Sequence, residues 1–155
     1  MGYLVTTRGR LRLPATQEND AFHAAVQAMT GRDGWFHPDD EPATSLADLA
    51  TYAAASLERE GDLLVLATDE DGDPKWSAQA TAFYVALAPF VGDGVVSFIG
   101  EDEETWTYTY AADGLTQNGV NGWDGAAEPF GEPAPDEQPA PAPAPRARRR
   151  WFGRG

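Results

Sequence analysis

The chain of 155 residues contains no cysteine, only two histidines and no apolar run near the roughly 20 residues that a membrane-spanning helix needs. The absence of cysteine excludes disulfide staples, zinc fingers and thiol catalysis. It also fits a reducing compartment, so we expect a cytoplasmic protein. The first residues, MGYLVTTRGRLRLP, lack the cationic and apolar segments of a signal peptide. No sequence motif indicates catalytic, cofactor-binding or metal-binding residues, and we assign none.

Basic residues are scarce as well, 11 against 25 acidic residues, and they are unevenly placed. Residues 1–145 hold all 25 acids and six of the basic residues, so their formal charge is −19. A domain this acidic repels nucleic acid and anionic lipid at long range and attracts basic partners. We therefore expect a protein partner with a basic surface and no direct nucleic-acid binding by the acidic domain. Taken alone, the charge is explained more simply by solubility than by a specific function of the acidic surface.

Three parts of the chain differ in composition: an acidic globular domain (1–124), a proline- and alanine-rich linker (125–145) and a basic tail (146–155). Proline at nearly alternate positions prevents the linker from forming a core and predicts disorder with extended stretches. The tail combines arginine with aromatic residues, which predicts a docking segment for an anionic membrane, nucleic acid, an acidic partner or its own domain. Its docking residues are Arg146, Arg148, Arg149, Arg150, Trp151 and Phe152.

Residues 3–13 alternate between two faces, which predicts a strand with one face buried. Arg8, Arg10 and Arg12 share the polar face. We favour a solvated face on which these arginines pair with the abundant acids, because exposed ion pairs are common. The alternative is a basic stripe that binds an anionic ligand.

Helical spacing predicts helices over residues 16–29, with Thr16 as the N-cap, and over residues 45–60. A strand over residues 62–68 follows, and then a helix over residues 74–90 that Asp73 caps. The loop at residues 31–42 carries Trp35 and Phe36, which either anchor the loop or contact a partner. His37 and the acids near it offer too few ligands of a recognisable pattern for a metal site. The acidic run at residues 69–73 begins like an EF-hand loop, but Pro74 and Ala80 stand where that loop needs glycine and glutamate.

Residues 95–99 and 105–110 are predicted to form a hairpin, and residues 115–120 a short last strand. Aromatic residues alternate with threonines along the second strand of the hairpin, so we expect the aromatic face in the core. The alternative is an exposed aromatic platform for single-stranded nucleic acid. The acidic tip opposes that alternative and is itself a candidate partner site: Glu101, Asp102, Glu103 and Glu104.

The order strand, helix, helix, strand, helix, strand, strand predicts an α+β fold. We expect a mostly antiparallel sheet of four to five strands with about three helices on one face. The three arginines of the first strand would then share the open face with Thr105, Thr107 and Thr109.

The helix and hairpin carry the residues Gly100, Glu101 and Asp102, then Trp106, then Asp113-Gly114. This pattern resembles small, functionally uncharacterised proteins of actinobacteria and their phages. The resemblance implies a bacterial or phage accessory protein and supplies no activity or functional residues.

We therefore expect a non-enzymatic interaction protein of inhibitor, immunity or adaptor type, with the basic tail as a docking or regulatory element. One alternative is a DNA mimic that blocks a nucleic-acid enzyme, which requires the acidic turns to lie along one surface. Another is an enzyme that uses carboxylates or a divalent metal.

Overall fold

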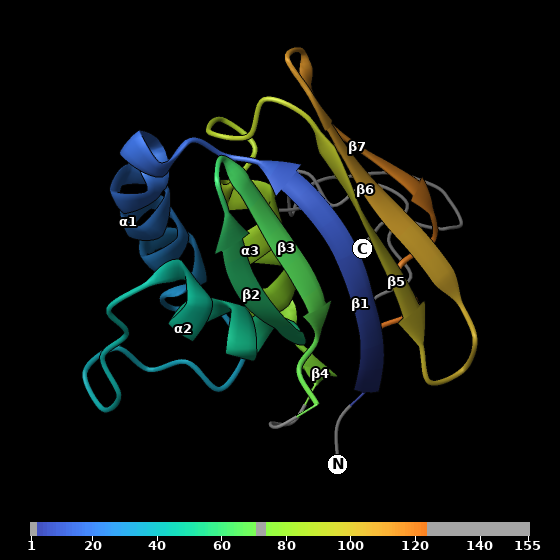
Figure 1. The fold of residues 1–155 in the computed structure, drawn as a ribbon. Helices are drawn as coiled ribbons and strands as arrows, with labels where there is room; N and C mark the ends of the chain where they lie inside the picture. The colour runs from blue at the N-terminus through green and yellow to red at the C-terminus, as the bar shows by residue number, and fades with distance from the viewer. Residues whose placement is uncertain (1–2, 71–73, 124–155) are drawn as a thin grey trace, which may run out of the picture.

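One antiparallel sheet, with helices on one side only, organises residues 3–70 and 74–123, the part of the chain that the structure, a computed structural model, describes (Figure 1). The strand order is β2-β3-β1-β5-β6-β7, and the short β4 pairs with β1 beside β3. The strands are β1 (Tyr3–Arg12), β2 (Ala55–Glu60), β3 (Leu63–Thr68), β4 (Lys75–Trp76), β5 (Gly94–Gly100), β6 (Thr105–Ala111) and β7 (Gly114–Gly119). The helices are α1 (Glu18–Met29), α2 (Leu46–Ala50) and α3 (Ala78–Ala86), with single 3₁₀ turns at Ala15–Gln17 and Thr51–Ala53.

The expected α+β class, the antiparallel sheet and the three helices are confirmed, whereas the expected four to five strands are too few. The first strand, the hairpin and the last strand lie where the alternation predicts them. The N-cap at Thr16 is wrong, because a 3₁₀ turn precedes α1 and no side chain caps that helix.

The predicted helix over residues 45–60 is also wrong beyond its first turns. Ser45 caps α2 as expected, since its hydroxyl accepts from the Asp48 amide. The helical run then ends at Ala54, whose φ of 63° is left-handed. Hydroxyl groups of Thr7 and Tyr84 donate to the carbonyls of Ala54 and Ala53, respectively, so distant residues stabilise this break. Such contacts override the helical propensity of the following residues.

Residues 55–60 form strand β2, which turns through Gly61 and Asp62 into β3. Arg59, on the covered face, donates from Nε to the Glu18 carboxylate at 2.8 Å and from Nη1 to the Leu13 carbonyl at 2.9 Å. These bonds link the edge strand to α1. The two-residue turn after residue 60 is a hairpin signal that the sequence does contain.

The third helix begins later than predicted. Lys75 and Trp76 form β4, and Ser77 rather than Asp73 caps α3 by accepting from the Gln79 amide. Trp76 extends from the sheet into an aromatic cluster, stacking on Tyr84 at 5.7 Å and meeting Trp106 edge-on at 5.4 Å. Because the Trp76 indole packs in this cluster, residue 76 stays in strand β4 and the helix begins only after Ser77.

The core lies between the helices and the covered face of the sheet. Trp106, Tyr108 and Tyr110 are buried there with Phe98, as the alternation of β6 predicts. An exposed aromatic platform for single-stranded nucleic acid is therefore excluded for these three residues.

Adjacent residues of β5 test the assignment of faces. Replacing the buried Phe98 by alanine should lower the free energy of unfolding by about 3–5 kcal/mol, because it leaves a cavity within the aromatic cluster. Replacing Ile99, which is 49% exposed, should cost about 1 kcal/mol or less. Denaturant titration of both variants measures the difference, and equal losses would contradict the one-sided sheet.

Candidate functional site

The open face of the sheet carries the three arginines that the sequence singles out. Arg8, Arg10 and Arg12 all point to the uncovered side of β1, while Val5 and Leu11 point into the core. In register, Arg8 is level with Ser97 of β5, and Ser97 is level with Thr107 of β6. The expectation that the arginines and the threonines share the open face is therefore confirmed.

Two of the arginines have acidic partners at the margins of the face. Arg10 lies 3.7 Å from the Glu60 carboxylate, and Arg12 lies 3.3 Å from that of Asp93. All four side chains are more than half exposed, so these pairs add little stability. Arg8 forms no ion pair or hydrogen bond with any residue of the described ranges.

On the strands of this face, carboxylates occur only on the edge strand β2. Register and alternation place Glu58 and Glu60 on the open side of the edge strand β2. The open-side residues of β1, β3, β5, β6 and β7 include no acid: Leu4, Thr6, Arg8, Arg10, Arg12, Leu63, Val65, Ala67, Val95, Ser97, Ile99, Thr105, Thr107, Thr109, Thr116 and Asn118. In a domain (residues 1–124) of −15 formal charge, the open face is thus an acid-poor surface with arginine at its centre.

The acidic tip at residues 101–104 is fastened to the start of β1. The Tyr3 hydroxyl donates to the Asp102 carboxylate at 2.5 Å, and the Leu4 amide donates to the Glu101 carboxylate at 2.8 Å. The Glu101 amide donates in return to the Leu4 carbonyl at 2.9 Å. The bond from Tyr3 lowers the pKa of Asp102, while burial and the same carboxylate raise the pKa of Tyr3.

The loop at residues 31–44 is held by one buried amide. Gln79 is fully buried, and its side chain accepts from the Phe36 amide at 2.9 Å and donates to the Phe36 carbonyl at 2.8 Å. Gly34 passes so close to this side chain that a Cβ there would collide with it. Phe36 is therefore an anchor, whereas Trp35 is 45% exposed beneath the Lys75 ammonium, 5.0 Å from its ring centre.

Three acidic segments, distant in sequence, lie on one side of the molecule (Figure 1): the loop at 31–44, the tip at 101–104 and residues 69–70 after β3. The tip at 101–104 adjoins the start of β1, which pairs with β4, and Lys75 of β4 lies over Trp35 of the loop at 31–44. In Figure 1 the end of β3 and the β5–β6 turn lie at the lower ends of the strands, and the loop at 31–44 lies on the same lower side, below α1 and α2. We call this surface the acidic edge; Asp69 is buried behind it, and its exposed carboxylates are Asp33, Asp39, Asp40, Glu41, Glu70, Glu101, Asp102, Glu103 and Glu104.

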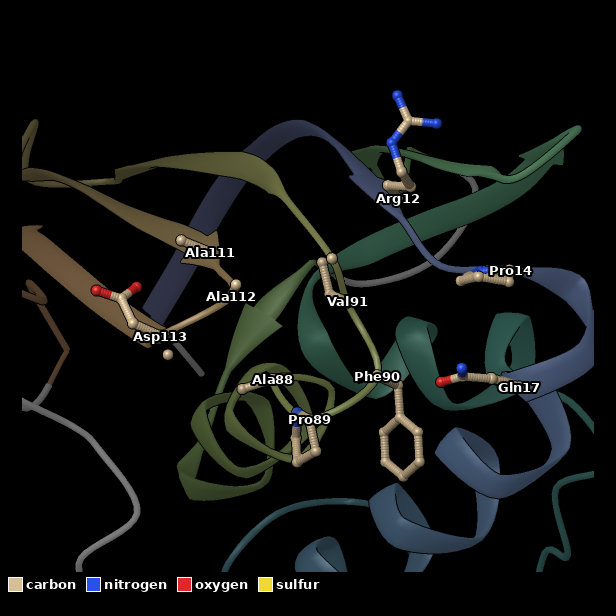
Figure 2. A pocket seen from close by; sticks show the side chains of 12 residues that line it. Arg12, Pro14, Gln17, Ala88, Pro89, Phe90, Val91, Ala111, Ala112 and Asp113 are labelled. Carbon is tan, nitrogen blue, oxygen red and sulfur yellow. The ribbon is translucent and has the colours of Figure 1, made fainter.

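A cleft of about 560 Å³ lies at the opposite edge, between the turn after β1, the end of α3 and the turn between β6 and β7 (Figure 2). Its lining is mostly alanine, proline, glycine and valine, with Phe90. Arg12 and Asp113 are the only ionisable residues among those lining it, and the Arg12 guanidinium points away from the Phe90 ring. No acid–base pair converges in this cleft.

Within residues 3–70 and 74–123, no three histidine or carboxylate side chains approach closely enough to hold a metal ion. His37 is exposed on its loop, and nothing joins it to a second ligand group there. In the same ranges, none of the helices is both long enough and apolar enough to cross a membrane.

The proposed docking residues of the tail lie outside the described residues. They are Arg146, Arg148, Arg149, Arg150, Trp151 and Phe152. The sequence did not identify Tyr3 and Gln79, the two residues that fasten the acidic turns. A tyrosine within a strand and a glutamine within a helix carry no local signal of a partner about 40 to 100 residues away.

Comparisons with protein-family models, curated proteins and solved structures gave no match. The resemblance to actinobacterial and phage proteins stays an expectation.

Gln79 should control the loop that carries Trp35. Replacing Gln79 by leucine leaves the Phe36 amide and the Phe36 carbonyl without this partner, and the Met29 carbonyl keeps only the Arg32 amide, so the free energy of unfolding should fall by about 2–4 kcal/mol. Amides of residues 31–44 should then exchange faster with solvent. The same replacement at the exposed Gln27 of α1 is the matched control and should cost about 0.5 kcal/mol or less. Slow exchange in the Gln79 variant would contradict the anchoring role.

Tyr3→Phe should raise the pKa of Asp102 toward the ordinary aspartate value of about 3.9. The bond favours the carboxylate, so its stabilisation is present above that ordinary value and is lost as the pH falls through the lower pKa of the folded state. Carboxyl NMR titration of both proteins measures the shift, with Asp113 as an internal control. An unchanged Asp102 pKa would show that the hydroxyl does not set it.

Proposed function

We propose that this chain is a non-enzymatic interaction protein whose acidic edge binds a basic surface of a protein partner. The convergence of three acidic turns on one edge is the observation that carries the proposal. Solubility alone requires no such convergence, because dispersed acidic residues serve it equally well.

The edge is suited to recognition because its turns are fastened. Tyr3 and Leu4 hold the tip, and Gln79 holds the loop that presents Trp35. Rigid presentation reduces the entropy lost on binding. An exposed tryptophan beside clustered carboxylates also offers both apolar area and charge to a basic partner.

The tail has a separate role in this proposal. Its arginines and aromatic residues tether the protein to an anionic surface or to an acidic region of a partner, as an inhibitor, immunity protein or adaptor requires. The long linker lets the tail bind while the acidic edge is occupied.

A DNA mimic is the second candidate, and the same alignment of turns favours it. Carboxylates along one continuous edge can occupy the phosphate-binding groove of a nucleic-acid enzyme. The two candidates differ in the partner surface, which for a mimic must be the site that binds DNA.

A charge-neutralised edge tests the proposal in the full-length chain. Glu101→Gln, Glu103→Gln and Glu104→Gln together should weaken binding to the basic partner about tenfold to hundredfold, if each lost pair contributes roughly 0.5–1 kcal/mol. Asp102 is kept because it holds Tyr3, and a glutamine at position 101 retains an oxygen that can accept from the Leu4 amide. The partner is first isolated from a host extract with the wild-type chain, and its affinity for each variant is then measured by calorimetry.

The matched control removes three acids away from the edge: Glu58→Gln, Asp62→Asn and Asp113→Asn. This variant has the same net charge as the edge variant, so it should retain nearly wild-type affinity. If both variants lost the same affinity for the partner, net charge alone would explain the loss, and the proposal would be overturned. Competition with duplex DNA then separates the candidates, because only a mimic is displaced from its partner by DNA.

A further inference from the structure

We propose that the acidic, proline-rich segment 128–137 of this chain docks on the open face of its own sheet, with its carboxylates on Arg8, Arg10 and Arg12. This inference goes beyond the proposed function and does not depend on the acidic edge. It assigns an occupant to the one face of the sheet that no helix of the described residues covers.

The open face has the composition of an interface. Leu4, Val95 and Ile99 are 44–49% exposed there and account for half of the large apolar side chains exposed in the described ranges. The arginines lie among these aliphatic groups and among threonines. Arginine and apolar groups together, with no acid on β1, β3, β5, β6 or β7 and acids only at the margins, favour an anionic occupant with some apolar surface.

Arg8 is the clearest indication of the occupant's charge. It lies near the centre of β1, level with Ala67 on one side and Ser97 on the other, and has no partner among the described residues. A planar guanidinium in such surroundings binds a carboxylate in a bidentate manner.

Segment 128–137, EPFGEPAPDE, has the matching chemistry. Its four carboxylates, Glu128, Glu132, Asp136 and Glu137, are separated by prolines, and Phe130 adds an apolar side chain. Proline-rich sequence is already extended before binding, so ordering it costs less entropy than ordering a flexible loop. Proline has no amide hydrogen to donate, so this segment cannot pair along an edge strand of the sheet. It is better suited to lie across the open face.

The described chain ends close enough for this contact. Gly122 lies against the Tyr3 hydroxyl at the start of β1. Arg8 is five residues further along β1, about 17 Å at the usual strand rise. The nine steps from Trp123 to Glu132 span roughly 28 Å when extended, which suffices to pass round the end of the sheet.

Tethering favours this segment over other occupants. An external acidic chain, or a second copy of this one, must approach a domain, residues 1–124, whose formal charge is −15. The tethered segment has no bimolecular cost, since a short linker gives an effective concentration of the order of millimolar.

A spin label on the full-length chain tests the contact. The chain has no cysteine, so Ala134→Cys creates a single labelling site. In isotope-labelled protein, the amides of β1, β5 and β6 nearest Arg8 should selectively lose intensity when the label is paramagnetic. The loss should vanish when Glu128→Gln, Glu132→Gln, Asp136→Asn and Glu137→Gln are combined, a variant that leaves the folded domain untouched. It should also weaken at about 0.5 M salt, where the Debye length is only a few ångströms.

The edge variant, Glu101→Gln, Glu103→Gln and Glu104→Gln, is the matched control and should retain the loss, so failure here is distinguishable from failure of the proposed function. Uniform or absent intensity loss would overturn the inference, as would a loss that persists in the neutralised segment. Loss seen only when the label is on a second, unenriched copy would assign the face to self-association instead. Equal shifts of these amides by added polyglutamate in the full chain and in the neutralised variant would show that the face is free for an external acidic partner.

Discussion

Alternation along β1 is the constraint on which the rest of the structure depends. This strand pairs with β3 and β4 on one side and with β5 on the other, so its two faces set those of the whole sheet. Val5 and Leu11 direct one face to the helices, and the three arginines, which alternate with them along the strand, can only lie on the other. A shift of one residue would bury three guanidinium groups, so the register has no low-energy alternative.

Features with a regular period could be predicted from the sequence, because the period itself encodes burial. The first strand, the aromatic face of β6 and the arginine–threonine open face all belong to this group. Residues 55–60 failed for a different reason: their composition suits a helix, and the left-handed Ala54 that ends the helix is stabilised by hydroxyl groups of Thr7 and Tyr84. No local sequence pattern indicates hydrogen bonds between residues this far apart in the chain.

The acidic turns illustrate the same limit at the surface. Each turn is evident in the sequence, but their meeting at one edge follows from strand direction and from contacts made by Tyr3, Lys75 and Gln79. Antiparallel strands place alternate turns at opposite ends of the sheet, so two turns share an edge only once the strand order is known. The order β2-β3-β1-β5-β6-β7 departs from chain order at β1, and this insertion places the start of β1 between the two strand-connecting acidic turns.

Separation of charge between an edge and a face has a physical consequence for association. Carboxylates on an exposed edge act over about a Debye length and steer a basic partner before contact. Arginines set among aliphatic groups act only at contact, where the loss of water strengthens each bond to a carboxylate. The edge therefore suits fast, salt-sensitive encounter, whereas the open face suits an occupant held close by other means. A segment of the same chain meets that second condition without any long-range attraction.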